Sequence, residues 1–96
     1  MPEHKVLEAA IKHYGATSQV VKLFEEMSEL QKELCKNFFG RDNLHEIAEE
    51  IADVQIMLKQ MILLYNCQEL VTIYRCMKVD RLQNKLAKEM QVNDGT

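Results

Sequence analysis

Apolar side chains recur at helical spacing along most of the chain, and this periodicity predicts four helices over residues 2–14, 18–38, 43–65 and 68–90. No stretch of useful length alternates between apolar and polar residues, so no strands are expected. The residues predicted to face inward are Val6, Leu7, Ala10, Ile11, Val20, Leu23, Phe24, Met27, Leu30, Leu34, Phe38, Leu44, Ile47, Ile51, Val54, Leu58, Leu70, Ile73, Met77, Leu82 and Leu86. The pattern favours an all-α, up-and-down helical bundle with short connections.

Residues at the segment ends support these boundaries. Gly15 and Gly40 each follow an apolar-periodic segment, where a C-terminal cap is expected. Ser18 is a candidate N-cap for the second helix. Asn43, with Glu46 three residues later, resembles a capping box and predicts the start of the third helix.

The third predicted helix changes character along its length. Its first half is amphipathic, whereas its second half is also apolar at Ile56, Met57, Leu63 and Leu64, off the main stripe. A helix that is apolar all round is buried all round. In so short a chain a second subunit is the expected cover, so we predict a homodimer or homotetramer with this segment at or near the contact.

The length of 96 residues suits one domain, so residues 1–96 are expected to form a single domain with a flexible tail at 92–96. The hydrophobic fraction of 47% and the charged fraction of 28% are ordinary for a globular protein. The net charge of −3 argues against a general nucleic-acid binder. Nine of the fifteen acids lie between Glu25 and Asp53.

The three cysteines, Cys35, Cys67 and Cys76, form no zinc or redox motif. We interpret them as reduced cytosolic thiols, two of them packed. The N-terminal residues resemble no signal peptide, and the longest apolar run, Ile62 to Tyr65, is far too short to span a bilayer. A cytoplasmic protein with no membrane partner is expected.

Paired carboxylates on two neighbouring helices carry the functional argument. EEMSE at residues 25–29 and EEIAD at residues 49–53 each place two acids three positions apart, where side chains are neighbours on a helix. If the two helices are antiparallel, Glu29, Glu50 and Asp53 fall at one level, with Glu26 one turn further along. Such carboxylates repel one another, and a hard divalent cation relieves the conflict. Oxygen ligands without His or Cys suit Mg²⁺ or Mn²⁺.

A solvated acidic face that supports neighbouring lysines is the ordinary alternative, because helices are rich in Glu. For a single pair of acids that alternative is the more common one. With a second pair of acids at a matched height on the next helix, the metal site and the solvated acidic face become equally well supported.

The strings EEMSEL at residues 25–30 and EIAD at residues 50–53 resemble the EExxE…ExxD signature of the all-alpha nucleotide pyrophosphohydrolases. That superfamily includes MazG, dimeric dUTPases and phosphoribosyl-ATP pyrophosphohydrolase. The resemblance runs from about Tyr14 to Leu86. The fuller strings FEEMSELQKELCK and EEIADVQIMLKQM look most like short, single-domain MazG-like proteins, which implies a MazG-type four-helix fold.

Carried over by residue, the resemblance implies that Glu26, Glu29, Glu50 and Asp53 bind magnesium. It implies that Glu25 helps to activate the attacking water. Members of the family hydrolyse a nucleoside triphosphate between the α and β phosphates, which yields the monophosphate and pyrophosphate. Many are dimers or tetramers in which two chains complete the substrate pocket.

Four further residues are candidates for substrate binding. Lys78 and Arg81 match a region where similar proteins carry basic residues near phosphates, although a solvated helix face explains them equally well. Lys22 either contacts phosphate or forms an i,i+4 ion pair with Glu26, and the ion pair is favoured. Gln19 follows Tyr14 and Gly15 in a pattern that similar proteins share, and is a candidate contact to the base or a helix-start residue.

The sequence therefore predicts a Mg²⁺-dependent nucleoside triphosphate pyrophosphohydrolase acting on dNTPs or non-standard nucleotides. Related activities on dUTP, dCTP or phosphoribosyl-ATP are the nearest alternatives. A non-catalytic helical interaction module, with merely solvating acids, is the alternative from another class.

Overall fold

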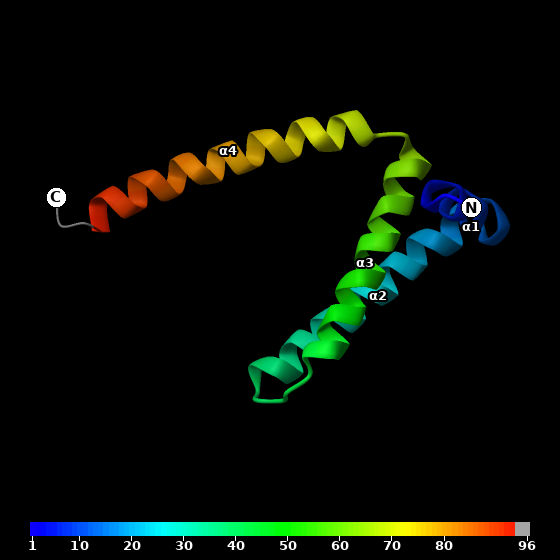
Figure 1. Cartoon of the computed structure of the whole chain (residues 1–96), viewed down its shortest axis with the longest axis horizontal. Helices are drawn as coiled ribbons and strands as arrows, with labels where there is room; N and C mark the ends of the chain where they lie inside the picture. Colours follow the sequence, from blue (N-terminus) through cyan, green and yellow to red (C-terminus); the bar gives the residue numbers. More distant parts are fainter. Residues whose placement is uncertain (94–96) are drawn as a thin grey trace. The chain divides into compact units, whose positions relative to one another are not determined.

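The computed structural model describes residues 1–93, with side chains described as far as residue 91. Within that range all regular secondary structure is α-helix. Four helices follow one another as α1 (Glu3–Tyr14), α2 (Ala16–Phe38), α3 (Leu44–Tyr65) and α4 (Gln68–Asn93) (Figure 1). The predicted all-α class and all four helices are confirmed. Of the tail predicted at 92–96, residues 92 and 93 belong to α4, and residues 94–96 lie outside the described residues.

The chain divides into two compact units, Met1–Asn66 and a second that begins at Cys67 and is built from α4. In the first unit α2 and α3 form the main contact, and α1 packs on both of them. Figure 1 shows α2 and α3 running in opposite directions beside each other. The expected single four-helix domain stays a prediction, because the structure shows bundle packing among α1, α2 and α3.

One side chain from each helix of the first unit forms the buried apolar core, namely Leu7, Leu23 and Met57. Leu7 and Leu23 were predicted to face inward. Met57 was assigned to the subunit contact, and that assignment is wrong because Met57 is buried within its own chain. The face of α3 that carries Met57 packs toward α1 and α2, and the spacing of residues within α3 alone does not predict this packing.

Many residues predicted to face inward are instead exposed. On α2 and α3 these are Phe24, Met27, Leu34, Phe38, Leu44, Ile51 and Leu58. On α1 the same is true of Val6, and on α4 of Leu70, Ile73, Met77, Leu82 and Leu86. The helical period identified the apolar faces correctly, but a three-helix unit covers only part of them.

The junction between α1 and α2 is a single residue, Gly15, at φ +92°. Its N–H donates to the Ile11 carbonyl and so caps α1, while its own carbonyl accepts from the Gln19 N–H at the start of α2. The left-handed φ suits glycine, which lacks a Cβ. The predicted N-cap Ser18 is therefore wrong, because α2 has already begun at Ala16.

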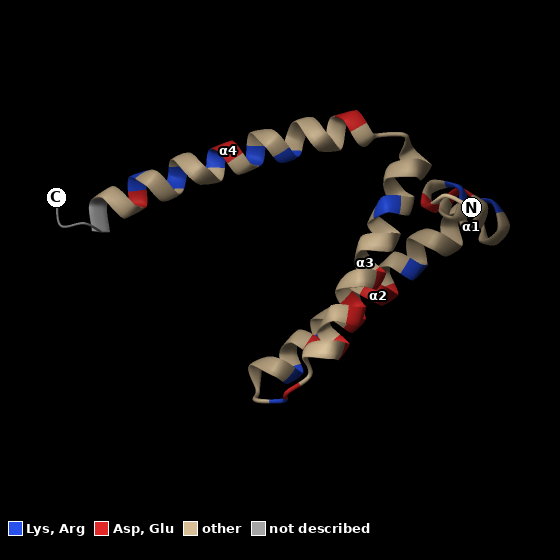
Figure 2. Cartoon of the chain, in the orientation of Figure 1, with Lys and Arg blue, Asp and Glu red and all other residues tan. Residues whose placement is uncertain are grey.

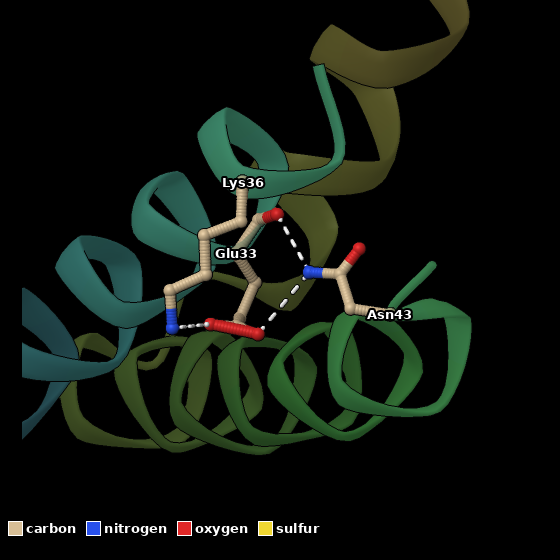
Figure 3. A network of polar contacts seen from close by, with 3 residues as sticks. All are labelled: Glu33, Lys36 and Asn43. Carbon is tan, nitrogen blue, oxygen red and sulfur yellow. Dashed lines mark hydrogen bonds and ion pairs between the residues drawn. The ribbon is translucent and has the colours of Figure 1, made fainter. Parts of the chain in front are cut away.

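Asn43 precedes α3 as predicted, yet its side chain does not cap the helix. Its Nδ2 instead donates to the backbone carbonyl of Glu33 at 2.9 Å and to Glu33 Oε1 at 3.2 Å (Figure 3). The Lys36 ammonium lies 2.9 Å from the other oxygen of that carboxylate. Asn43 and Glu33 are both buried. The predicted capping box is thus replaced by a lock between the end of α2 and the start of α3, which sets the relative height of the two helices.

Two paired interactions hold the Glu33 carboxylate in its charged form. The hydrogen bonds from Lys36 and Asn43 lower the pKa of Glu33 below its ordinary value. At the other end of the unit the Lys59 ammonium pairs with Glu3 and ties α3 to α1.

Among the described residues no helix combines the length and apolar character that a bilayer crossing requires.

We predict that Asn43→Ala destabilises the folded protein by about 1–3 kcal/mol, because the buried Glu33 carbonyl loses its donor. The matched control is Asn37→Ala, which removes an exposed side-chain bond to the Arg41 carbonyl on the same connection and should change stability little. Urea denaturation followed by circular dichroism measures both. Equal effects of the two substitutions would contradict the assignment of Asn43 as the lock.

Candidate metal centre and adjoining pocket

Several acidic residues of α2 and α3 lie along the stretch where the two helices run beside each other (Figure 2). Glu26 from α2 and Glu50 and Asp53 from α3 each offer a carboxylate oxygen, and these three oxygens lie within 4.8 Å of one another. Glu50 and Asp53 share one face of α3 because they are three residues apart. The predicted convergence of acids from adjacent helices is confirmed for these three side chains.

Glu29 and Glu25 occupy less central positions. The sequence placed Glu29 level with Glu50 and Asp53, and Glu26 one turn away, whereas the structure puts Glu26 opposite both acids of α3. The prediction assumed two ideal helices with antiparallel axes, and the observed height of α2 relative to α3 differs from that assumption. Glu29 is exposed and outside the group of three, but its charge acts on Glu50. Its role as a metal ligand, like that of Glu25 as a base, stays a prediction.

Burial and mutual repulsion raise the pKa of two acids in the cluster. The pKa of Glu50 rises chiefly through burial, with further contributions from the charges of Glu26, Asp53 and Glu29. The pKa of Asp53 rises for the same reasons, burial first and Glu26 second. Glu50 Oε2 is buried and has no hydrogen-bond partner within the described chain. A buried carboxylate oxygen without a donor is rare in native proteins and calls for an explanation.

Lys22 balances part of this negative charge. Its ammonium lies 3.2 Å from Glu26 Oε1 and 3.7 Å from Glu25 Oε2. The hydrogen bond to Glu26 and the charges of both acids raise the pKa of Lys22. The predicted i,i+4 ion pair with Glu26 is therefore confirmed, while the phosphate contact stays a prediction.

The donor set fits a hard divalent cation. All three converging groups are carboxylates, which is the ligand type that Mg²⁺ and Mn²⁺ prefer. The unpartnered Glu50 Oε2 would gain the positive partner that the chain itself does not supply. Exposed acidic clusters are common on helices, so the buried, unpartnered oxygen is the observation that distinguishes this cluster from a solvated acidic face.

A pocket of about 560 Å³ adjoins the acid cluster on the side nearer α1. Three of the sequence-predicted residues line it, namely Gln19, Lys22 and Glu25. Lys22, which lines the pocket, also forms the ion pair with Glu26 and so connects the pocket to the acid cluster. Met57 and Gln60 of α3 line the same pocket, and sequence reasoning assigned neither to a site. Gln60 lies seven residues after Asp53, which places both on one face of α3, so helical period alone could have indicated it.

Lys78 and Arg81 lie on α4 in the second unit. Arg81 shares one surface of that helix with the basic side chains of Lys85 and Lys88. Cys35 and Cys76 are exposed and Cys67 is partly buried, all three as free thiols, so the expectation of two packed cysteines is wrong. The assignment of Lys78 and Arg81 to phosphate binding stays a prediction.

No protein-family model, no curated protein and no solved structure matches this chain.

The raised pKa values define a pH dependence for the metal-free protein. A carboxyl group with a higher pKa in the folded state binds more protons there, so stability falls as pH rises from its ordinary value, 4.5 for Glu50, toward the raised one. We predict that Glu50→Gln removes part of this loss and raises the melting temperature at pH 7. Thermal melts in EDTA from pH 4 to 8 measure it, with Glu49→Gln as control. A Glu50→Gln protein that is less stable than wild type at neutral pH would disprove the repulsion argument.

Proposed function

We propose that this chain is a Mg²⁺-dependent nucleoside triphosphate pyrophosphohydrolase of the MazG-like, all-alpha type. The observation that carries the proposal is the convergence of Glu26, Glu50 and Asp53 from two helices, with one Glu50 oxygen buried and unpartnered. The resemblance of EEMSEL and EIAD to that family's signature supports it. The reaction would release a nucleoside monophosphate and pyrophosphate, and its substrates would be dNTPs or non-standard nucleotides.

The residues of the chain divide into three roles under this proposal. Glu26, Glu50 and Asp53, with Glu29 beside them, would hold Mg²⁺ or Mn²⁺. The bound ion supplies charge neutralisation for the phosphates and activates a water molecule. Glu25 is exposed on the pocket wall next to Glu26 and would accept the proton of the attacking water.

Lys22 and Gln19 would contact the substrate. Lys22 lies on the pocket wall with its ammonium directed at Glu26, so an entering phosphate would meet a cation at the edge of the cluster. Gln19 lies one turn before Lys22 on the same face of α2 and lines the same pocket. Lys78 and Arg81 of α4 remain candidate phosphate contacts under this proposal. Free thiols suit a reducing compartment, which supports our proposal of a cytoplasmic activity.

We predict that Glu50→Gln and Asp53→Asn each lower kcat/KM by at least about a hundred-fold, because replacing even outer-shell partners of a metal site costs about 10–100-fold. Glu49→Gln removes the same charge from the next position of α3 and is the control, since Glu49 lies outside the converging group. Steady-state hydrolysis of a nucleoside triphosphate panel with Mg²⁺ measures the effect, and chromatography separates pyrophosphate from orthophosphate.

Two results would contradict the proposal in different ways. Release of a diphosphate and orthophosphate would mean that the site attacks a different phosphate. An absence of stoichiometric Mg²⁺ or Mn²⁺ binding in calorimetry, with no turnover of any nucleotide by the wild-type protein, would favour a helical interaction module whose acids merely solvate the surface.

A second copy of the chain is the proposed cover for the exposed apolar faces. Only three apolar side chains are buried in the described chain, whereas Ile51 and Leu58, which lie seven residues apart on one face of α3, are both exposed. Fully burying a side chain of this size contributes about 1.5–3 kcal/mol. A twofold contact would bury such a face against itself without leaving open ends. We therefore propose a homodimer or homotetramer, as the family resemblance also implies.

We predict that Ile51→Glu and Leu58→Glu shift the protein toward smaller species, because each introduces a charge into the proposed contact face. Ala52→Glu adds the same charge at an exposed position of α3 that lies off this face and is the control. Sedimentation velocity over a wide concentration range measures the assembly. The prediction fails if the wild-type protein is already a monomer at micromolar concentration.

A further inference from the structure

Gln60 presents an unusual feature at the wall of the pocket between α1, α2 and α3. Its residue is 4% exposed, and its Oε1 is buried without a hydrogen-bond partner in the part of the chain that the structure describes. The same residue lines the 560 Å³ pocket. Buried amide oxygens in native proteins are almost always paired with a donor. Gln60 Oε1 is therefore an acceptor without a donor on a residue of the pocket wall, and a ligand that carries an N–H group could supply that donor.

The surroundings of Gln60 specify what kind of ligand this is. Gln19, on the facing helix α2, is 6% exposed and brings a second side-chain amide to the same pocket. Met57, 6% exposed, adds an apolar surface to the same pocket. Each amide offers one acceptor and two donors in a plane. Apolar surface with a few convergent polar groups suits a flat heterocycle that has apolar faces and a hydrogen-bonding edge.

The position of this pocket relative to the acids narrows the ligand further. Gln60 lies seven residues after Asp53 on α3, and Gln19 lies seven residues before Glu26 on α2. Seven residues correspond to roughly 10 Å along a helix, so both amides stand about two turns from the acid cluster. Lys22 lies between, on the pocket wall and bonded to Glu26. A molecule with a heterocycle at one end and phosphates at the other matches this order.

We propose that Gln60 is a specificity-determining residue that reads the edge of the nucleobase through hydrogen bonds, with Gln19 opposite it. The ligand class is a nucleotide whose base presents an N–H donor to Gln60 Oε1. This assignment rests on the proposed hydrolase function for the direction of the phosphates. The base contact itself rests on the buried, unpartnered amide.

The decisive experiment compares Gln60→Met with wild type for hydrolysis of the four dNTPs and of inorganic tripolyphosphate with Mg²⁺. Met keeps the length and the volume of the side chain and removes the hydrogen-bonding groups. We expect kcat/KM for the preferred dNTP to fall at least about ten-fold, mostly through KM, and the ranking of the four bases to flatten. Tripolyphosphate, which has no base, should be affected less than two-fold. Gln55→Met on the exposed side of the same helix is the control.

A binding experiment separates this inference from the proposed function. The side-chain amide signals of Gln60, assigned by their absence in Gln60→Met, are followed by NMR as each of the four deoxynucleosides is added. We expect the preferred nucleoside to shift them in wild type, and Gln60→Glu, which keeps acceptors and loses donors, to alter which nucleoside binds. This result without turnover would support the base contact and defeat the hydrolase.

Two outcomes overturn the proposal. Turnover with an unchanged base ranking in both folded Gln60 variants would leave the hydrolase standing and make Gln60 a structural residue. Amide signals that no nucleoside shifts, together with absent turnover, would show that the buried oxygen is paired by solvent and that neither proposal holds.

Discussion

Repulsion between carboxylates that share the α2–α3 contact is the constraint around which the first unit is organised. Glu26, Glu50 and Asp53 would separate if they were on flexible loops, but each is fixed to a long helix. The helices in turn are held at their relative height by the Asn43–Glu33 lock at one end and by the contacts of α1 at the other. Part of the favourable free energy of folding therefore offsets the repulsion between these carboxylates, which is typical of functional sites.

A second consequence of this arrangement is a gradient of chemistry along one seam. Near the α2–α3 connection the seam holds a network in which the Glu33 carboxylate is paired with Lys36 and with Asn43 Nδ2, while Asn43 Oδ1 is buried without a partner among the described residues. In the middle it holds acids with raised pKa values and an unpartnered oxygen. Toward α1 it opens into a pocket with two buried amides. Two of the three buried side-chain oxygens that lack a partner among the described residues, Glu50 Oε2 and Gln60 Oε1, thus belong to the acid cluster and to a residue of the pocket wall.

Much of this was predictable from the sequence, and the failures have identifiable causes. Helix boundaries at Phe38, Tyr65 and Gln68 follow from apolar period and from Gly40 and neighbouring polar residues. The convergence of Glu50 and Asp53 with an acid of α2 follows from spacing alone. The choice between Glu26 and Glu29 did not, because it depends on how the axes of two helices cross, which one-dimensional spacing cannot express. Met57 was missed for a related reason, since only the third helix, α1, makes its face of α3 an interior, whereas the spacing of seven residues from Asp53 could have indicated Gln60.

Because Gly15 alone connects α1 to α2, the orientation of α1 depends on the number of residues at this junction. A single residue ends one helix and begins the next, with hydrogen bonds in both directions and no slack between them. One inserted residue in α1 near this junction would turn the preceding part of that helix by about 100° about its axis. Leu7 would leave the core while the α2–α3 seam kept its register. By contrast, the connection between α2 and α3 spans several residues and can absorb a change in length at Arg41 or Asp42. Natural variation in length within proteins of this design should therefore be rare at the first junction and concentrated at the second.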